Sequence, residues 1–267
     1  MSQSPPNNTP KKERLDLLMV QKKLAPTRSK ARDLIKSGHV RVDGEITKKA
    51  GQTWQETAEI VIAKEAPDFV SRAGVKLSHA LKHFEMDCED KVILDLGAST
   101  GGFTQVLLEQ GAAHIYAVDV GHDQLHPDLK NNERVTSMEG QDARTLTRES
   151  FSHPINAITV DVSFISLMKL LEKPLTLVEP GGWIIALIKP QFEVGKKALG
   201  KKGVVKDEAA IEQVLKDVTV WFETHDQWHV IGLIPSPITG QTGNQEFLIC
   251  VGKEDEGSWF IPQYKTT

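Results

Sequence analysis

The chain has 267 residues, 39% of them hydrophobic and 25% charged, and a formal net charge of −4. These values are typical of a globular protein, and no apolar run reaches the roughly 18 residues that a membrane-spanning helix needs. The polar segment from Met1 to Pro10 is predicted to be a disordered tail and not a secretory signal. Cys88 and Cys250 fit neither a disulfide framework nor a metal-ligand spacing. We therefore expect a cytoplasmic protein with no metal site.

Charge is unevenly distributed along the chain. Between Lys11 and Lys49 there are twelve lysines and arginines against five acidic residues, a local net charge of +7, so the remainder carries −11. A basic head on an acidic body favours a polyanionic partner for the head. A solvated charged surface would give the same counts, so charge alone leaves that alternative open.

The basic head contains the pattern of a small α+β module. Apolar residues spaced as on one helix face predict a helix within Arg14–Leu24. A second helix is predicted over Lys30–Ser37, capped by Thr27 or Ser29. Alternating residues then turn at Asp43-Gly44, which is a strong hairpin signal. The predicted RNA-contacting side chains of this module are Arg14, Arg28, Lys30, Arg32, Lys36 and Arg41.

The string from Arg14 to Gly51 resembles the S4-type RNA-binding domain. The resemblance rests on Arg-Leu-Asp at its start, Thr-Arg-Ser-Lys-Ala before the second helix and Gly-His-Val-Arg-Val-Asp-Gly after it. It implies structured RNA as the partner of this module and nothing about chemistry. A generic helix–helix–hairpin is the alternative.

After a linker at 65–75, short apolar runs alternate with helical stretches. The runs are Lys91–Asp95, His114–Asp119, Arg134–Met138, Ile155–Val160, Trp183–Ile188, Val230–Ile234 and Phe247–Val251, and the helical stretches include Gly101–Gln110, Ile165–Val178 and Glu208–Phe222. This alternation predicts an α/β fold with a parallel sheet covered on both faces. Ligands of such sheets bind beyond the carboxyl ends of the strands.

The first of these strands runs into a glycine-rich loop. Glycines let the backbone approach a ligand closely and open a helix whose N–H groups face it. A dinucleotide site would have the spacing Gly-x-Gly-x-x-Gly, but the third position of this run is Ser99. The acidic residue just before the loop points instead to S-adenosylmethionine, whose methionine ammonium needs a nearby carboxylate. Asp119 would hold the ribose hydroxyls and Asp142 the adenine. The predicted cofactor-binding residues are Asp95, Gly97, Ala98, Ser99, Gly101, Gly102, Phe103, Asp119, Asp142 and Asp161.

Four charged residues are predicted to meet at the same mouth of the sheet. Asp161 and Lys189 end successive strands, Glu246 precedes the last one, and Lys76 lies just before the catalytic core. A ribose hydroxyl must lose its proton as it accepts a methyl group, and a lysine can take that proton only in its neutral form. We expect Lys189 to be the base, with Lys76, Asp161 and Glu246 orienting and tuning it.

The chain from 11 to 252 resembles the TlyA (hemolysin A) family, whose catalytic domain is similar to the FtsJ class of ribose 2′-O-methyltransferases. The resemblance rests on Asp-Phe-Val-Ser-Arg-Ala-Gly-Val-Lys-Leu, the glycine loop, Asp-Val-Ser-Phe-Ile-Ser, Ile-Lys-Pro-Gln-Phe-Glu and Gly-Asn-Gln-Glu. Ser99-Thr100 departs from the Ala-Pro pair common in that class. The resemblance implies a Lys-Asp-Lys-Glu tetrad at Lys76, Asp161, Lys189 and Glu246, ribosomal RNA in a ribosomal subunit as substrate, and a cytidine 2′-hydroxyl as acceptor.

The domains expected are a tail at 1–10, an S4-type domain at 11–64, the linker at 65–75, an FtsJ-like methyltransferase domain at 76–252 and a tail at 253–267. The lysine-rich segment Phe192–Lys206, including Lys196 and Lys197, is expected to be a lid that closes on RNA, and a solvated surface loop is the alternative. Arg72 is expected to couple RNA docking to cofactor binding. The alternatives are an RNA base N-methyltransferase, a non-catalytic RNA-binding or ribosome-assembly factor, and a pore-forming protein.

Overall fold

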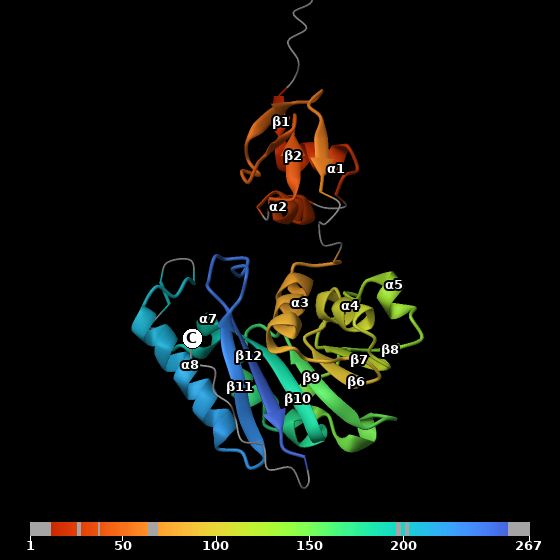
Figure 1. Cartoon of the computed structure of the whole chain (residues 1–267), viewed down its shortest axis with the longest axis vertical. Coiled ribbons are helices and arrows are strands. Elements are labelled where there is room, and N and C mark those ends of the chain that lie inside the picture. Colours follow the sequence, from red (N-terminus) through yellow and green to blue (C-terminus); the bar gives the residue numbers. More distant parts are fainter. Residues whose placement is uncertain are drawn as a thin grey trace, which may run out of the picture. The chain divides into compact units, whose positions relative to one another are not determined.

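The computed structural model of the chain describes residues 12–25, 28–36, 38–63, 69–195, 199–200 and 203–255. The chain divides into two compact units, Met1–Asp68 and Phe69–Thr267 (Figure 1). Both expected tails, apart from residues 253–255, lie outside the described residues, as do Lys196 and Lys197. The part of the expected linker that is described, residues 69–75, belongs to the second unit.

The first unit packs two helices against short strands. Its elements are β1 (Lys12–Arg14), α1 (Leu15–Gln21), α2 (Arg28–Lys36), β2 (Val40–Val42), β3 (Glu45–Ile46), β4 (Thr53–Gln55) and β5 (Ile60–Ile62). One sheet has the order β3-β2-β5, and β1 pairs with β4. Leu15 and Met19 of α1, Ile35 of α2, and Val40 and Val42 of β2 form its core. The module is therefore closed by apolar residues at the helical and alternating spacing seen in the sequence.

Two boundaries in this unit differ from the prediction. The first helix is shorter than Arg14–Leu24 because Arg14 pairs with Thr53 in a β-ladder and Lys23 adopts a left-handed backbone with φ of 57°. The second helix begins at Arg28, so Ser29 lies inside it and is not its cap, while Thr27 lies outside the described residues. The hairpin turn is confirmed: Asp43 and Gly44 both have positive φ, 50° and 84°, as a two-residue turn of the mirror-image type requires.

The second unit is a seven-stranded sheet with the order β11-β12-β10-β9-β6-β7-β8. Its strands are β6 (Val92–Leu96), β7 (His114–Asp119), β8 (Val135–Glu139), β9 (Ile155–Val160), β10 (Val178–Ile188), β11 (Trp228–Pro235) and β12 (Phe247–Lys253). Its helices are α3 (Ala73–Phe84), α4 (Gly102–Glu109), α5 (Pro127–Lys130), α6 (Leu167–Leu171), α7 (Pro190–Glu193) and α8 (Glu208–Glu223), with 3-10 turns at Ala143–Thr145, Arg148–Ser150 and Pro174–Leu177. The single helix expected over Ile165–Val178 is thus split into α6 and a 3-10 turn that begins at Pro174.

The sheet is parallel except at β12, which runs antiparallel to both of its neighbours. Successive residues of the strands alternate between two cores: Ile184 and Ala186 of β10 face α6 and α8, whereas Ile185 and Leu187 face α3 and α4. The expectation of helices on both faces is confirmed, and that of an all-parallel sheet is wrong at one strand. This reversal places the start of β12 at the edge where the parallel strands end.

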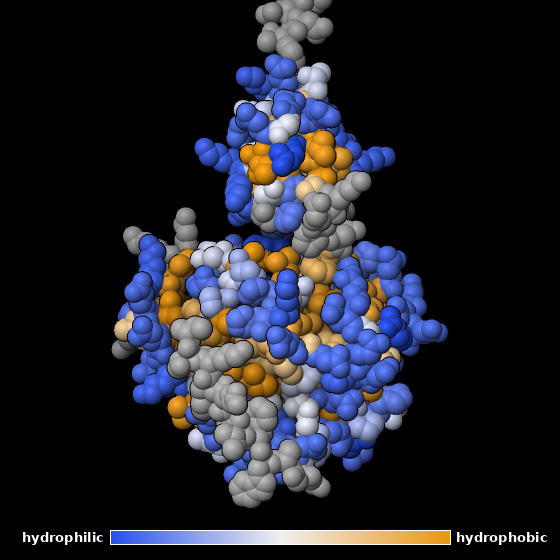
Figure 2. Space-filling view, viewed as in Figure 1, coloured by the Kyte–Doolittle hydropathy of each residue, from blue (hydrophilic) through white to orange (hydrophobic). Residues whose placement is uncertain are grey.

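The described residues include no helix that is long and apolar enough to cross a membrane. Hydrophilic side chains occupy much of the face that Figure 2 shows, with apolar residues scattered between them. Such scattered apolar exposure is ordinary for a globular surface.

Candidate active site

Three strands bring charged residues to one edge of the sheet. Asp161 directly follows β9 and Lys189 directly follows β10, which are parallel neighbours. Glu246 directly precedes β12, whose first residue Phe247 pairs with Ile188. Because β12 is antiparallel, its beginning meets the ends of the other two strands. The predicted convergence of these three residues at one mouth is therefore confirmed.

Lys189 and Asp161 form an ion pair, with 2.6 Å between Nζ and Oδ1. Nζ also donates a hydrogen bond to Oγ of Ser163 at 3.0 Å. Lys189 is 9% exposed, so its amine lies at the floor of the mouth and is held from two sides. Ser163 has no place among the residues predicted from the sequence, although its position two residues after Asp161 could have suggested it.

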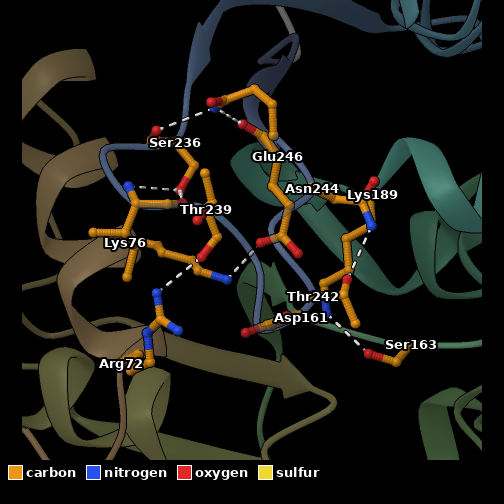
Figure 3. A network of polar contacts seen from close by, with 12 residues as sticks. Arg72, Lys76, Asp161, Ser163, Lys189, Ser236, Thr239, Thr242, Asn244 and Glu246 are labelled. Atoms are coloured by element: carbon orange, nitrogen blue, oxygen red, sulfur yellow. Dashed lines mark hydrogen bonds and ion pairs between the residues drawn. The ribbon is translucent and has the colours of Figure 1, made fainter. Parts of the chain in front are cut away.

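Lys76 and Glu246 form a second pair, 2.6 Å from Nζ to Oε2. Lys76 lies on the first turn of α3 and is 7% exposed, and Glu246 is 3% exposed. Figure 3 shows both pairs within one network of polar contacts. A buried charge needs a partner of opposite sign, and here each lysine has its own carboxylate.

The loop between β6 and α4 has the close contacts expected of a ligand cradle. A Cβ added to Gly97 would lie 2.6 Å from the backbone oxygen of Asp161, and one on Gly102 would lie 2.1 Å from Oγ of Ser71. Gly97 and Gly101 have φ of 82° and 95°, a region that disfavours any other residue. Ala98 is buried beneath the turn and Phe103 is almost fully buried in the core under α4.

Ser99 and Asp119 are joined at the surface of this loop. Ser99 has φ of 47°, and its backbone N–H donates to Oδ2 of Asp119 at 2.9 Å. The other oxygen of Asp119 accepts from the N–H of Gly121 at 2.7 Å. Asp119 thus lies beside the loop with both oxygens held by backbone N–H groups, and its contact with the ribose stays a prediction. Val120, which follows it, is 70% exposed and was not predicted.

Asp95 lies under the loop and not on its surface. Its two oxygens accept from the hydroxyls of Thr104 at 2.6 Å and Thr159 at 3.0 Å, and its side chain is fully buried. Burial raises the pKa of Asp95 to about 7, despite these hydrogen bonds. In this arrangement Asp95 ties the start of α4 to β9, so its direct contact with a cofactor ammonium remains a prediction.

Asp142 follows β8 and is bound by Arg144. Oδ2 accepts from Nη2 of Arg144 at 2.6 Å, and Oδ1 accepts from Nε and from the backbone N–H of the same residue. These hydrogen bonds lower the pKa of Asp142 to about 2.

Glu139, at the end of β8, binds the N–H groups of Gln124 and Leu125 and the amine of Lys130. It fixes the segment that packs against the glycine loop, a role that the sequence did not indicate.

Phe164 is the most exposed large apolar side chain of the described residues, at 90%. It stands three residues after Asp161, has φ of 67°, and its ring lies 5.0 Å from that of Phe192. A positive φ is unusual for an aromatic residue. The exposure and the strained backbone together mark an exposed ring that follows directly after Ser163, the hydrogen-bond partner of Lys189, which sequence reasoning missed.

In the first unit, the predicted RNA-contacting residues differ in their surroundings. Arg14 and Arg28 donate to the buried carboxylate of Asp16, at 2.9 and 3.0 Å. Arg32 and Lys36 are exposed on α2. The remaining predicted contacts also differ in setting: Lys30 is half-buried, and Arg41 is exposed and donates to the carbonyl of Gly44. Arg14 and Arg28 therefore have a structural partner in addition to any RNA contact.

Arg72 immediately precedes α3, in the second unit. Its Nη2 donates to the carbonyl of Thr239 at 2.9 Å (Figure 3). Thr239 belongs to the segment between β11 and β12 that ends at Glu246. Arg72 and Lys76 thus reach the same segment from one side of the start of α3, which is a structural role beside the predicted coupling.

Comparison with known proteins matches both units. The S4 domain matches residues 13–60 and the FtsJ-like methyltransferase matches residues 69–253. The chain is 42% identical to Bacillus subtilis YqxC over 93% of its own length and 89% of that protein. It is 38% identical to the 16S/23S rRNA (cytidine-2′-O)-methyltransferase TlyA of Mycobacterium tuberculosis, over 90% and 89% of the two chains.

A solved structure agrees over the same span. A Streptococcus thermophilus protein designated a hemolysin superposes with a TM-score of 0.70 at 39% identity, covering 92% of this chain and 90% of that one. Identity of this size over nearly whole chains includes both units and their order. The chain therefore belongs to the FtsJ-like methyltransferases, in the TlyA (hemolysin A) group that carries an S4 domain ahead of the catalytic unit.

Proposed function

We propose that this protein transfers a methyl group from S-adenosylmethionine to the 2′-hydroxyl of a cytidine in ribosomal RNA. The observation that carries the proposal is the buried Lys189–Asp161 pair at the mouth of the sheet, with the Lys76–Glu246 pair beside it. The TlyA relatives named as cytidine-2′-O-methyltransferases support the acceptor. The S4 domain supports RNA as the partner, and we propose a ribosomal subunit as the substrate particle and the cytoplasm as its location.

The residues around the glycine loop fit S-adenosylmethionine. Gly97 and Gly102 leave no room for a Cβ because Asp161 and Ser71 crowd them, so glycine at these positions lets the loop lie close to Asp161, at the mouth where the ligand would bind. Asp119 would hold the ribose hydroxyls, Asp142 the adenine amine, and the exposed Val120 would contact the adenine face. When bound, S-adenosylmethionine supplies an electrophilic methyl group on a sulfonium.

The lysine pairs supply what a ribose acceptor needs. Lys189, as a neutral amine, would take the proton of the 2′-hydroxyl as that oxygen accepts the methyl group. Asp161, 2.6 Å from that amine, stabilises the ammonium that forms. Lys76 and Glu246 flank the reacting groups and orient the ribose. An amine on a base would not require such a lysine, and this distinguishes the proposal from base N-methylation.

Phe164 is proposed to receive the target nucleotide's base. An exposed aromatic ring beside a catalytic lysine offers a stacking surface to a nucleobase turned out of its helix. Phe192 supports the ring from one side. Because stacking tolerates any base, Phe164 would hold the nucleotide in place and leave base identity to other contacts.

The test is methyl transfer from radiolabelled S-adenosylmethionine to unmodified ribosomal subunits, followed by alkaline digestion. Alkali cannot cleave beside a 2′-O-methyl group, so label in alkali-resistant dinucleotides, lost with Lys189→Ala, supports the proposal. Label in mononucleotides would move the acceptor to a base and refute it. Sequencing of the labelled dinucleotide then tests whether the methylated residue is a cytidine.

A further inference from the structure

The segment between β11 and β12 folds back on the carboxylate that it carries. Its last residue, Glu246, reaches Lys76 through Oε2. A Cβ added to Gly240 would lie 2.4 Å from Oε1 of Glu246. The backbone of Gly240 therefore forms a wall against one carboxylate oxygen while Lys76 holds the other.

A tight turn holds the backbone of Gly240 in this position. The N–H of Gly243 donates to the carbonyl of Gly240 at 2.9 Å, and the N–H of Gly240 donates to the carbonyl of Asn244 at 2.8 Å. Gly243 has φ of 92°, and a Cβ there would meet nothing within 4 Å. The turn is closed by backbone hydrogen bonds on one side and lies against Glu246 on the other.

Asn244 connects this turn to a second segment. Its side chain is 1% exposed. Oδ1 accepts from the N–H of Val205 at 2.9 Å, and Nδ2 donates to the carbonyl of Gly203 and to Oγ1 of Thr242, each at 3.0 Å. One buried amide thus satisfies donors and acceptors of the segment that follows α7 and of the turn before Glu246. A buried amide satisfied in this way is costly to replace, since its partners would be left without hydrogen bonds.

We propose that Gly240 and Asn244 are positioning residues for the Lys76–Glu246 pair. Gly240 fixes the carboxylate by close contact, and Asn244 fixes the turn by joining it to 203–205. The proposal rests on the proposed function, because Glu246 matters to the reaction only if the tetrad acts in it. Both residues would act through Glu246, and Figure 3 shows Asn244 and Glu246 in the same network of polar contacts.

The experiment is a double-mutant cycle between Gly240→Ala and Glu246→Gln in the full-length protein, assayed by kcat on ribosomal subunits. If Gly240 acts through Glu246, Gly240→Ala lowers kcat roughly tenfold or more, and adding it to Glu246→Gln lowers kcat no further. Asn244→Ala should be non-additive in the same way. Additive losses would overturn the proposal, because they would mean an effect that does not pass through Glu246.

The matched control is Gly243→Asn, in the same turn. Asparagine tolerates a left-handed backbone, and the added side chain has open space, so kcat should stay within twofold of the parent. An equal loss in Gly243→Asn would show that any change in the turn is harmful and would overturn the specific role of Gly240. Affinity for S-adenosylhomocysteine, measured by calorimetry, should be unchanged in all these variants.

A second measurement does not depend on activity. The 13Cε resonance of Lys76, assigned by its absence in Lys76→Arg, should shift in Gly240→Ala and Asn244→Ala as it does in Glu246→Gln, and stay in place in Gly243→Asn. A shift without any loss of kcat would keep the positioning role and refute the catalytic role of Glu246 in the proposed function. An unmoved resonance would refute the positioning role itself.

Discussion

Lys189 and Asp161 lie at the carboxyl ends of two neighbouring parallel strands, with the amine 2.6 Å from the carboxylate. Their adjacency follows from topology, because the register pairs Ala186 with Val160. Asp161, one residue after Val160, and Lys189, three residues after Ala186, therefore reach the same edge. The pair is nearly closed off from solvent, and an amine in such a setting can exchange a proton with one bound hydroxyl while bulk water is kept away.

Replacement of Lys189 by alanine should reduce kcat for methyl transfer by about 10²- to 10⁴-fold, the usual contribution of a positioned general base. Affinity for S-adenosylhomocysteine should stay the same, because Lys189 follows β10 and is not one of the residues expected to bind the cofactor. Single-turnover transfer to ribosomal subunits and calorimetry would check the two halves of this prediction. Lys216→Ala, on the exposed face of α8, is the matched control. A rate for Lys189→Ala within tenfold of the parent would rule out its role as the base.

Phe164→Ala should lower kcat/KM for RNA roughly 5- to 150-fold, the equivalent of about 1–3 kcal/mol for one stacked base. The melting temperature should not fall, because the ring is 90% exposed and therefore buries little apolar surface in the fold. Phe164→Tyr should retain the activity, and Val220→Ala, which trims another exposed apolar residue, should have no effect. Fluorescence of 2-aminopurine placed at the target would report the loss of stacking directly.

The sequence was most informative where the pattern is local. The Asp43-Gly44 turn, the glycine loop and the strand-end charges all depend on a few neighbouring residues, and their positions agree with the structure. Lys76 and Glu246 are 170 positions apart in the sequence, and their pairing depends on one reversed strand. Apolar periodicity does not distinguish strand direction, so β12 was expected to be parallel.

Other features could not be read from residue types at all. Asp95 and Asp119 both lie near the end of a strand, yet the first is enclosed by two threonines and the second faces the loop surface. Asp95 pairs with Ala117, so Asp119 is on the same side of the sheet but two residues nearer the edge where the strands end. The exposure of Phe164 likewise results from its left-handed backbone, which an aromatic residue gives no reason to expect.

Asp95 should make the stability of the protein fall as the pH rises from about 4 to 7. Its pKa is raised from 3.8 to about 7 by burial, so the folded protein keeps a proton that the unfolded chain loses first. The contribution is greatest below 3.8 and is lost as the pH approaches 7, by at most about 1.4 kcal/mol per pH unit.

The measurement compares Asp95→Asn with the parent. An amide cannot ionise, so the melting temperature of the variant relative to the parent should rise steadily from pH 4 to pH 7, without cofactor present. Asp217→Asn, on the exposed face of α8, should show no such trend. A constant difference between Asp95→Asn and the parent would mean that Asp95 is ionised in the folded protein throughout this range.

Mutation should divide the basic residues of the S4 module into a class that stabilises the fold and a class that binds RNA. Arg14 is tied to the buried Asp16, and this contact lowers the pKa of the carboxyl, so Arg14→Ala should lower the melting temperature of the first unit. Arg32 and Lys36 are exposed on α2, so their alanine variants should melt like the parent but bind RNA more weakly. Each should also reduce the slope of log affinity against log salt concentration by about 0.7 to 1, as expected when one phosphate contact is lost. Filter binding at several salt concentrations gives this slope. An unchanged slope in both variants would place the RNA on a different surface of the module.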